Sequence, residues 1–409
     1  MSATVERDDE LDVEEDVLTG KVRPVAGHGR TIEHGTRAHL AYRAVGWLAF
    51  LAVAVAVPVM VASPVVFSLG DSTFTIGIEN LNHAIAYMVA VLGINFLIGF
   101  TGQISLGNSF FLGMGAYITA ILVEDHSWSF FLTPLVVVPL CFLLGFLVGI
   151  PALRIRGLYL ALVTLALAVV FPSLVKLDSL ADSTGASNGK VVGADLNSPI
   201  DFEALGSALE SLPLIGDWFS GVGEREEHAI WSYLLVSLIA GLCFLVSSNM
   251  RRSRFGRALV AIRDNETGAA VSGVNLALYK TVSFGVSAAL CGVGGVLFTM
   301  AVGTLSPDTF GINLAIFLIV GLVVGGVGTS WGPVIGGLVI IFVPHLTSQV
   351  SSVNGYELTG DRPYGTLCLG LLLIALTFIL PGGVVDGFHR LRNRVVRVVR
   401  TPPEPGTGR

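Results

Sequence analysis

The chain has 409 residues, of which 53% are hydrophobic and 13% charged, with a formal net charge of −6 at pH 7 and a mean hydropathy of +0.75. A water-soluble domain of this length would not contain repeated apolar blocks of roughly 20 residues, the length that an α-helix needs to cross a bilayer. None of the long blocks alternates as the strands of a membrane β-barrel do. The sequence therefore predicts an all-α integral membrane protein.

The elements are predicted in chain order as follows. Residues 1–43 are a largely disordered cytoplasmic tail, because the acidic stretch from Glu6 to Asp16 has no apolar face to bury. The next apolar block is too long for the hydrophobic region of a signal peptide, so we expect it to remain in the membrane. Residues 44–384 are a transmembrane domain, and residues 385–409 are a basic cytoplasmic tail. Ten spans are predicted, at about 45–66, 82–100, 104–123, 130–153, 158–176, 229–248, 279–303, 312–327, 332–347 and 364–381.

The lysines and arginines of the connections indicate the orientation, because these residues are retained on the cytoplasmic side. With the N-terminus inside, the outer segments hold only four of the 24, which are Lys176, Lys190, Arg225 and Arg362. We therefore expect both termini in the cytoplasm. The sixth span then lies between a long external loop, 177–228, and a cytoplasmic loop, 249–278.

Several classes of membrane protein are disfavoured by what the sequence lacks. No charged residue falls at a clear mid-membrane position, where ion-coupled carriers and proton pumps place such groups. The segment most similar to a P-loop, Gly185–Val192, has the wrong spacing and ends in Val, so the chain is not expected to bind ATP itself. The histidines lack metal-binding or catalytic spacing, so no metal site and no catalytic residue are predicted, and a membrane enzyme is a remote alternative. The cysteines are expected to be buried thiols: Cys141, Cys243, Cys291 and Cys368.

The cytoplasmic loop has the signals of a short helix pair. Five arginines lie between Arg251 and Arg263, and the apolar side chains of Phe255, Leu259 and Ile262 share one side of a first helix. For the second helix, Asp264 is the predicted N-cap, Glu266 favours the first turn, and Gly273 suits a C-terminal position with positive φ. We predict a docking element for a cytoplasmic partner. The alternative is a loop that is merely basic, as the positive-inside rule requires.

Glycine is concentrated in two segments, Gly99–Tyr117 and Gly321–Gly337. Small residues let helix backbones approach closely, so tight helix packing is one interpretation. The other is that Gly102 to Asn108 is a re-entrant or unwound stretch that lines a pathway, because irregular backbone at membrane depth persists only where protein covers it or it lines a cavity.

Five successive blocks resemble a known family. They are Tyr87–Leu122, Leu153–Val170, Gly256–Lys280, Gly325–Gly337 ("GGVGTSWGPVIGG") and Leu380–Gly387 ("LPGGVVDG"). In this order they are similar to the branched-chain amino acid permease family of ABC importers, and in particular to its M-type membrane subunit. The resemblance covers about residues 82 to 387. Urea and short-chain amide permeases share these blocks.

The resemblance implies a permease subunit for branched-chain, that is hydrophobic, amino acids in the plasma membrane of a prokaryote. Its implied partners are a homologous second permease subunit, two cytoplasmic ABC ATPases that use ATP and Mg, an external solute-binding protein and the lipid bilayer, with no nucleic acid and no cofactor on this chain. Glu266, Ala269, Ala270 and Gly273 match the EAA-like segment that enters a groove on an ATPase. The full coupling set is Arg257, Arg263, Asp264, Glu266, Ala269, Ala270 and Gly273. Because Gly268 disfavours helix, the second helix is expected to be short. The alternatives are a urea or amide permease and an ATP-independent channel.

A pathway for a zwitterionic solute needs weak polar contacts, since a deep binding well would slow release. Uncharged polar side chains within apolar spans provide them, and the predicted pathway comprises Asn95, Gly102, Gln103, Ser105, Asn108 and Thr164. The alternative is that these groups form hydrogen bonds between helices, which contribute about 0.6 kcal/mol each.

The external loop is longer than a connection between helices needs, and it is rich in acidic residues. It is either a solvated acidic surface or a landing surface for the solute-binding protein, with Pro213–Phe219 as an apolar anchor on the membrane. Its segment Asp182–Val192 is similar to an external glycine-rich segment of the family but departs from the usual double-glycine form.

Overall fold

The computed structural model of the chain describes residues 30–33, 65–69, 72–153, 157–193 and 224–348, and short segments at 352–353, 356–357, 370–371, 374–375, 382–388 and 396–399. The chain divides into two units, one of Met1–Val55 with Asp386–Arg409 and one of Ala56–Val385. In the first unit, β1 (Arg30–Glu33) pairs in parallel with β8 (Val396–Val399), and Arg30 lies opposite Val396.

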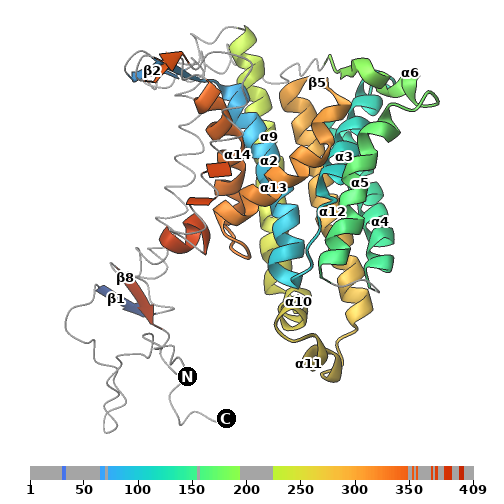
Figure 1. Ribbon diagram of the computed structural model, residues 1–409, viewed down its shortest axis with the longest axis vertical. Coiled ribbons are helices and arrows are strands. Elements are labelled where there is room, and N and C mark those ends of the chain that lie inside the picture. Colours follow the sequence, from blue (N-terminus) through green and yellow to red (C-terminus); the bar gives the residue numbers. More distant parts are fainter. Residues whose placement is uncertain are drawn as a thin grey trace, which may run out of the picture. The chain divides into compact units, whose positions relative to one another are not determined.

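Helices make up most of the described part of the second unit (Figure 1). They are α2 (Ile78–Ile94), the π-helix η1 (Asn95–Gly99), α3 (Asn108–Glu124), η2 (Phe130–Leu132), α4 (Thr133–Ala152), α5 (Leu158–Val175), α6 (Ala181–Thr184), η3 (Ala186–Asn188), α9 (Glu224–Arg252), α10 (Arg254–Asp264), α11 (Glu266–Val271), α12 (Leu276–Val302), η4 (Pro307–Phe310), α13 (Ile312–Gly325) and α14 (Gly332–Ser348). Three antiparallel strand pairs complete it: β2 (Val65–Leu69) with β3 (Ser72–Ile76), β4 (Lys190–Val191) with β5 (Thr304–Leu305), and β6 (Ser352–Val353) with β7 (Tyr356–Glu357).

Apolar helices indicate a multi-pass membrane protein. Within the described residues, four are long and apolar enough to cross a membrane: Ile78–Gly99, Phe130–Ala152, Trp231–Arg252 and Leu276–Val302. Four shorter apolar helices are Asn108–Glu124, Tyr159–Val175, Ile312–Gly325 and Gly332–Leu346. These helices coincide with eight of the ten predicted spans. The predicted spans at 45–66 and 364–381 lie mostly outside the described residues, and Val65 and Val66 belong to β2.

The boundaries of the second and third predicted spans differ from the structure. Helix α2 begins at Ile78, and α3 begins at Asn108, four residues after the predicted start at 104. The later start of α3 follows from the connection from Gly102 to Leu106, which is not helical and which Figure 1 shows as an extended cyan coil. Gly102 opens it with φ +71°, a conformation that favours glycine. The prediction of an unwound stretch is therefore confirmed for the backbone of these residues.

Helix α12 is the central helix of the second unit and packs against α2, α3 and α4. Its contact with α3 is close because glycines face each other: a Cβ on Gly115 would collide with the carbonyl of Gly292, and one on Gly295 with the carbonyl of Leu112. The interpretation of tight packing is confirmed here. The hydrophobic effect does not hold helices together within a bilayer, so their association depends on van der Waals contact and interhelical hydrogen bonds. The close approach at these glycines allows both.

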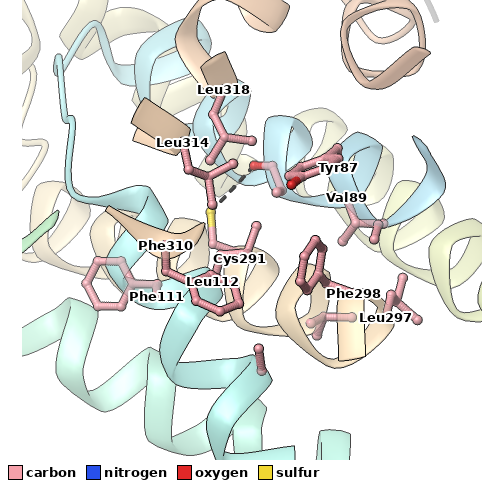
Figure 2. Packing of buried hydrophobic residues seen from close by; sticks show 14 of the residues in the cluster. Tyr87, Val89, Phe111, Leu112, Cys291, Leu297, Phe298, Phe310, Leu314 and Leu318 are labelled. Carbon is pink, nitrogen blue, oxygen red and sulfur yellow. Dashed lines mark hydrogen bonds between the residues drawn. The ribbon is translucent and has the colours of Figure 1, made fainter. Parts of the chain in front are cut away.

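Side chains of α12 donate to backbone carbonyls of its neighbours. The Ser287 hydroxyl donates to Gly93 O at 2.7 Å, and that of Thr299 to Ala116 O at 3.1 Å. The thiol of Cys291 lies 3.5 Å from Ala90 O, and Figure 2 shows it among Leu112, Leu314 and Leu318. Cys141 and Cys291 are buried free thiols, as predicted, and Cys243 is half-buried. Cys368 lies outside the described residues.

The outer faces of several helices are apolar and exposed. Large hydrophobic side chains project from α4, α5 and α9, with Leu135, Tyr159 and Leu238 the most exposed on each. A surface of this kind fits lipid or another membrane subunit. Helix α13 has 14 residues, so it spans only about 21 Å at 1.5 Å per residue and is too short to cross the hydrocarbon core alone.

Candidate functional site

The predicted cytoplasmic loop, residues 249–278, folds as the helix pair α10–α11; we call it the coupling loop. On α10, Leu259 and Ile262 are buried, and the half-buried ring of Phe255 stacks on Tyr279 with centroids 5.3 Å apart. Arg254 and Arg257 of the same helix are exposed. The two-sided pattern read from the sequence is confirmed. The pair lies at one end of α12, and β5 lies at the other (Figure 1).

The N-cap of α11 is Asn265, so the prediction of Asp264 is wrong. Asn265 has extended backbone angles, and its Oδ1 accepts from the Gly268 N–H at 2.8 Å. Asp264 is the last residue of α10. Its Oδ1 accepts instead from Nε and Nη2 of Arg263, at 3.1 Å each.

The C-terminal end of α11 agrees with the prediction for Gly273. Its φ is +84°, its N–H donates to Ala270 O at 3.0 Å, and the Val274 N–H donates to Ala269 O at 3.1 Å. This pair of bonds is a Schellman motif, which satisfies carbonyls left free at a helix end. The six-residue α11 thus has a hydrogen-bonded cap at each end, and it presents Val271, which is 85% exposed.

Two ionic side chains tie the coupling loop to the helix bundle. Glu266 accepts from Lys280 Nζ of α12 at 2.7 Å, with the two side chains 31% and 14% exposed. Arg263 donates from Nη1 to the carbonyl of Gly99 at 2.8 Å. Arg257 takes no part in either link and donates to Arg252 O within the loop region. The loop is therefore joined both to α12 and to the end of η1.

Gly99 leads to a first cluster, in which Asn95 is the one predicted pathway residue. Asn95 of η1 is fully buried; its Nδ2 donates to Thr329 O at 2.8 Å, and its Oδ1 accepts from the Gly328 N–H at 2.7 Å. Gly99 itself presses on Gly328, since a Cβ on Gly99 would lie 2.8 Å from the Gly328 Cα. The α13–α14 turn, residues 325–332, is thus fastened to the end of the second span.

Ser105, Asn108 and Thr164 form a second cluster. The Thr164 hydroxyl accepts from the Leu106 N–H at 3.0 Å, and the Asn108 Nδ2 donates to Ser105 O at 3.4 Å. Ser287 of α12 lies 3.5 Å from Asn108 Oδ1. Gln103 lies in the unwound connection, and its Nε2 is buried with no hydrogen-bond partner among the described residues. Of the six predicted residues, Asn95 is bonded to the α13–α14 turn, while Ser105, Asn108 and Thr164 form one cluster. Gly102 and Gln103 lie in the unwound connection, with Gly102 against Arg263.

Sequence reasoning missed several members of these clusters. Ser287, Gly328 and Thr329 contact predicted residues that are distant in the sequence, and Lys280 contacts Glu266, 14 residues before it. Gly328 and Thr329 lie in a glycine-rich block that the sequence did single out. Lys280 and Ser287 carry no local signal. Among the described residues, no three His, Cys, Asp or Glu side chains converge as metal ligands do.

The opposite end of α12 is covered by residues 177–193, which we call the β4 cap. The nearly buried Lys190 donates to both oxygens of Asp125 at 2.7 Å and to Ser183 O at 2.6 Å. Lys176 pairs with Asp308 of η4 at 2.7 Å. Gly189, in the segment similar to the family's glycine-rich one, has φ +77° and lies directly against Leu305 O. Residues 194–223 of the predicted external loop, including Pro213–Phe219, are outside the described residues.

Comparison with known proteins decides the family. Residues 78–377 match the model of the family described as branched-chain amino acid transport system / permease component. The chain belongs to this family. It is 28% identical over 350 residues to the high-affinity branched-chain amino acid transport system permease protein LivM of Salmonella typhimurium, covering 83% of this chain and 74% of that protein. LivM of Escherichia coli is 28% identical over 346 residues, with the same coverage. The probable permease protein LivH of Methanocaldococcus jannaschii is 26% identical over 283 residues, covering 66% of this chain and 79% of that protein. No solved structure matches the chain.

Proposed function

We propose that this family member is the membrane-spanning permease subunit of an ABC importer that translocates branched-chain amino acids. An external solute-binding protein delivers the amino acid, and two ATPase subunits hydrolyse ATP with Mg on their own chains. A homologous second permease subunit completes the membrane part, since the relatives include both LivM and LivH proteins.

The coupling loop carries this proposal. A partner that hydrolyses ATP can shift a membrane bundle only if it contacts the bundle differently in two states. Helix α11 offers a capped, rigid tip with exposed Val271, and Glu266 and Arg263 join that tip to α12 and to η1. Arg257 and Ala270 are exposed beside it, whereas Ala269 is buried and fixes α11 on its base. A merely basic loop needs none of these features.

The coupling loop faces the cytoplasm in this proposal, and so do both termini. The support is the charge asymmetry of the connections, because the loop alone contains five arginines within thirteen residues. The β4 cap then faces outward and meets the binding protein, in the plasma membrane of a prokaryote.

The solute passes the unwound connection from Gly102 to Leu106. Irregular backbone inside a membrane protein is tolerated where it is covered or lines a cavity, and half-helix ends there commonly meet the solute. Gln103, Ser105, Asn108 and Thr164 provide replaceable polar contacts along it. Asn95 has a different part: both ends of its amide are engaged by the α13–α14 turn, so it holds one wall of the pathway in place.

Purification from native membranes tests the proposal. The chain, isolated by an affinity tag in mild detergent, is expected to carry ABC ATPase subunits, and its ATP hydrolysis is expected to rise with a leucine-loaded binding protein. In proteoliposomes the complex should take up labelled leucine only when ATP is enclosed in the lumen, on the side of the coupling loop, and the loaded binding protein is outside.

The same preparation separates the alternatives. If urea or acetamide inhibits the uptake of labelled leucine, whereas isoleucine and valine do not, the substrate belongs to the amide class. A chain that purifies without ATPases and conducts solute alone would contradict the proposal and support a channel.

A further inference from the structure

We propose that Arg263 is the positioning residue that transmits movement of the coupling loop to the gate formed by the unwound connection and the α13–α14 turn. This inference rests on the proposed function, because it assumes that an ATPase moves the loop. It assigns to the Arg263 side chain the connection between the coupling loop, which the ATPase moves, and the unwound connection, which the solute passes.

The guanidinium of Arg263 divides its donors between two partners. Nε and Nη2 donate to Asp264 Oδ1, and Nη1 donates to Gly99 O. Arginine holds its five N–H donors in a rigid planar fork, so fixing one edge fixes the direction of the other. Asp264 thereby aims the arginine at Gly99, and any rotation of the end of α10 is passed to that carbonyl.

Gly99 is the natural receiver of such a contact. It is the last residue of η1, and the carbonyls at the end of a helix lack partners within the helix and favour a cation. Three residues later the backbone turns at Gly102, where φ is +71° and the helix stops. The end of the second span is therefore held by Arg263 on one side and by a non-helical hinge on the other.

Arg263 also touches the hinge and the opposite wall. A Cβ on Gly102 would lie 3.1 Å from the Arg263 Cγ, so the arginine stem packs on the hinge itself. A Cβ on Gly328 would lie 3.7 Å from Nη1. Asn95 extends this contact, because its side-chain amide forms hydrogen bonds with the Gly328 N–H and the Thr329 carbonyl of the α13–α14 turn. The Arg263 side chain thus contacts Asp264 of the coupling loop, the end of the second span and the α13–α14 turn.

Glu266 and Lys280 cannot replace this link. Their ion pair ties α11 to the first turns of α12, which is the central packed helix and has no irregular backbone within its bounds. The pair fixes where the loop sits, whereas Arg263 reaches the segment that can move.

The test uses the whole complex of permease subunits and ATPases in proteoliposomes, with leucine-loaded binding protein. Arg263→Lys keeps the charge and the stem but loses the fork, and Arg263→Ala removes both. The matched control is Arg254→Ala, an exposed arginine at the start of the same helix. The readouts are the yield of assembled complex, the rate of ATP hydrolysis, and the leucine carried for each ATP.

Both Arg263 variants are expected to assemble and to hydrolyse ATP, with leucine carried per ATP reduced about tenfold, the size of change that substitutions between coupled sites produce. Arg254→Ala should match the wild type in all three readouts. A normal ratio in Arg263→Lys and Arg263→Ala overturns the inference, and so does loss of assembly in both, which would assign Arg263 to structure alone. A wild-type complex that hydrolyses ATP without carrying leucine contradicts the proposed function instead, whatever the variants do.

Discussion

The two ends of α12 are held by opposite means. At the β4 cap, polar groups are paired with one another: Lys190 with Asp125, Lys176 with Asp308, and β4 with β5. At the coupling loop, α11 is capped by its own chain, joined to the bundle by two side chains, and exposes an apolar tip at Val271. The first end is closed on itself, whereas the second leaves an apolar side chain exposed at its tip.

The aromatic packing sharpens this contrast. Phe310 of η4 is fully buried under the β4 cap, with its ring 5.4 Å from Phe298, 5.9 Å from Tyr117 and 5.9 Å from Phe171. Figure 2 shows Phe310 and Phe298 within the same cluster of buried residues. One short element thus ties α3, α5 and α12 together at the closed end. An importer in which this end is closed must open it to accept a solute.

Two glycines with positive φ test the contrast most strongly. Gly189 of the β4 cap lies against Leu305 O, whereas a Cβ on Gly273 of the coupling loop would meet nothing within 4 Å. Gly273→Ala should cost about 1 kcal/mol from the left-handed backbone alone. Gly189→Ala adds a collision with backbone and should cost about 3 kcal/mol in total. Thermal unfolding in detergent measures both, and equal shifts in Tm would contradict the difference in packing.

The two ion pairs of the closed end are expected to differ. Asp125→Asn removes the charge that balances the nearly buried Lys190 and should destabilise the protein by about 2 kcal/mol, less than a fully buried pair because Asp125 is 37% exposed. Asp308→Asn is the matched control, since Lys176 and Asp308 are 32% and 73% exposed. It should cost less than about 0.5 kcal/mol. A larger Tm shift for Asp308→Asn would reverse the assignment of which pair holds the cap.

At the coupling loop, charge reversal should affect transport more than stability. Glu266→Lys places two cations together and should lower leucine uptake per complex several-fold, while the amount of protein in the membrane stays near normal, because a partly exposed pair contributes about 1 kcal/mol or less. The exchange Glu266→Lys with Lys280→Glu restores the opposite charges. It should recover part of the uptake. Normal uptake by Glu266→Lys alone would remove the loop from the mechanism.

Apart from the control Asp308→Asn, the smallest effects are expected at the two asparagines of the predicted pathway. Asn95→Leu loses two short hydrogen bonds to the α13–α14 turn, which should destabilise the folded complex by about 1 kcal/mol. The yield of folded complex should fall as a result. Asn108 makes only long contacts, at 3.4 and 3.5 Å, so Asn108→Leu should lower uptake per complex with yield unchanged. If neither change alters uptake per complex, these side chains are not part of the pathway.

Local signals in the sequence predicted the coupling loop, and they could not predict its links. The amphipathic pattern of α10 and the glycine after α11 specify a helix pair by themselves. Asp264 and Asn265 are both good N-cap residues, and the choice between them depends on Arg263, which engages the carboxylate of Asp264. The bond from Arg263 to Gly99 joins residues 164 positions apart, and that from Gly328 to Asn95 joins residues 233 apart. No periodicity or spacing encodes such pairs.

The transmembrane pattern was predictable to a similar degree. Apolar blocks marked eight described helices, and the glycines between Gly99 and Tyr117 left two alternatives open, close packing or an unwound stretch. The structure places the two effects at different residues: Gly102 turns the backbone, while Gly115 packs against Gly292. Composition alone could not separate them, because both uses require the same residue.

Site-specific crosslinking tests the central claim, that α11 is the tip on which an ATPase acts. A photoreactive side chain at Val271, exposed on α11, is compared with one at Val191, which is 67% exposed on β4. In membranes containing the whole complex, Val271 should give an adduct with an ABC ATPase subunit whose yield changes when ATP is added, and Val191 should give none with the ATPase. An ATPase adduct at Val191, or none at Val271, would contradict the account.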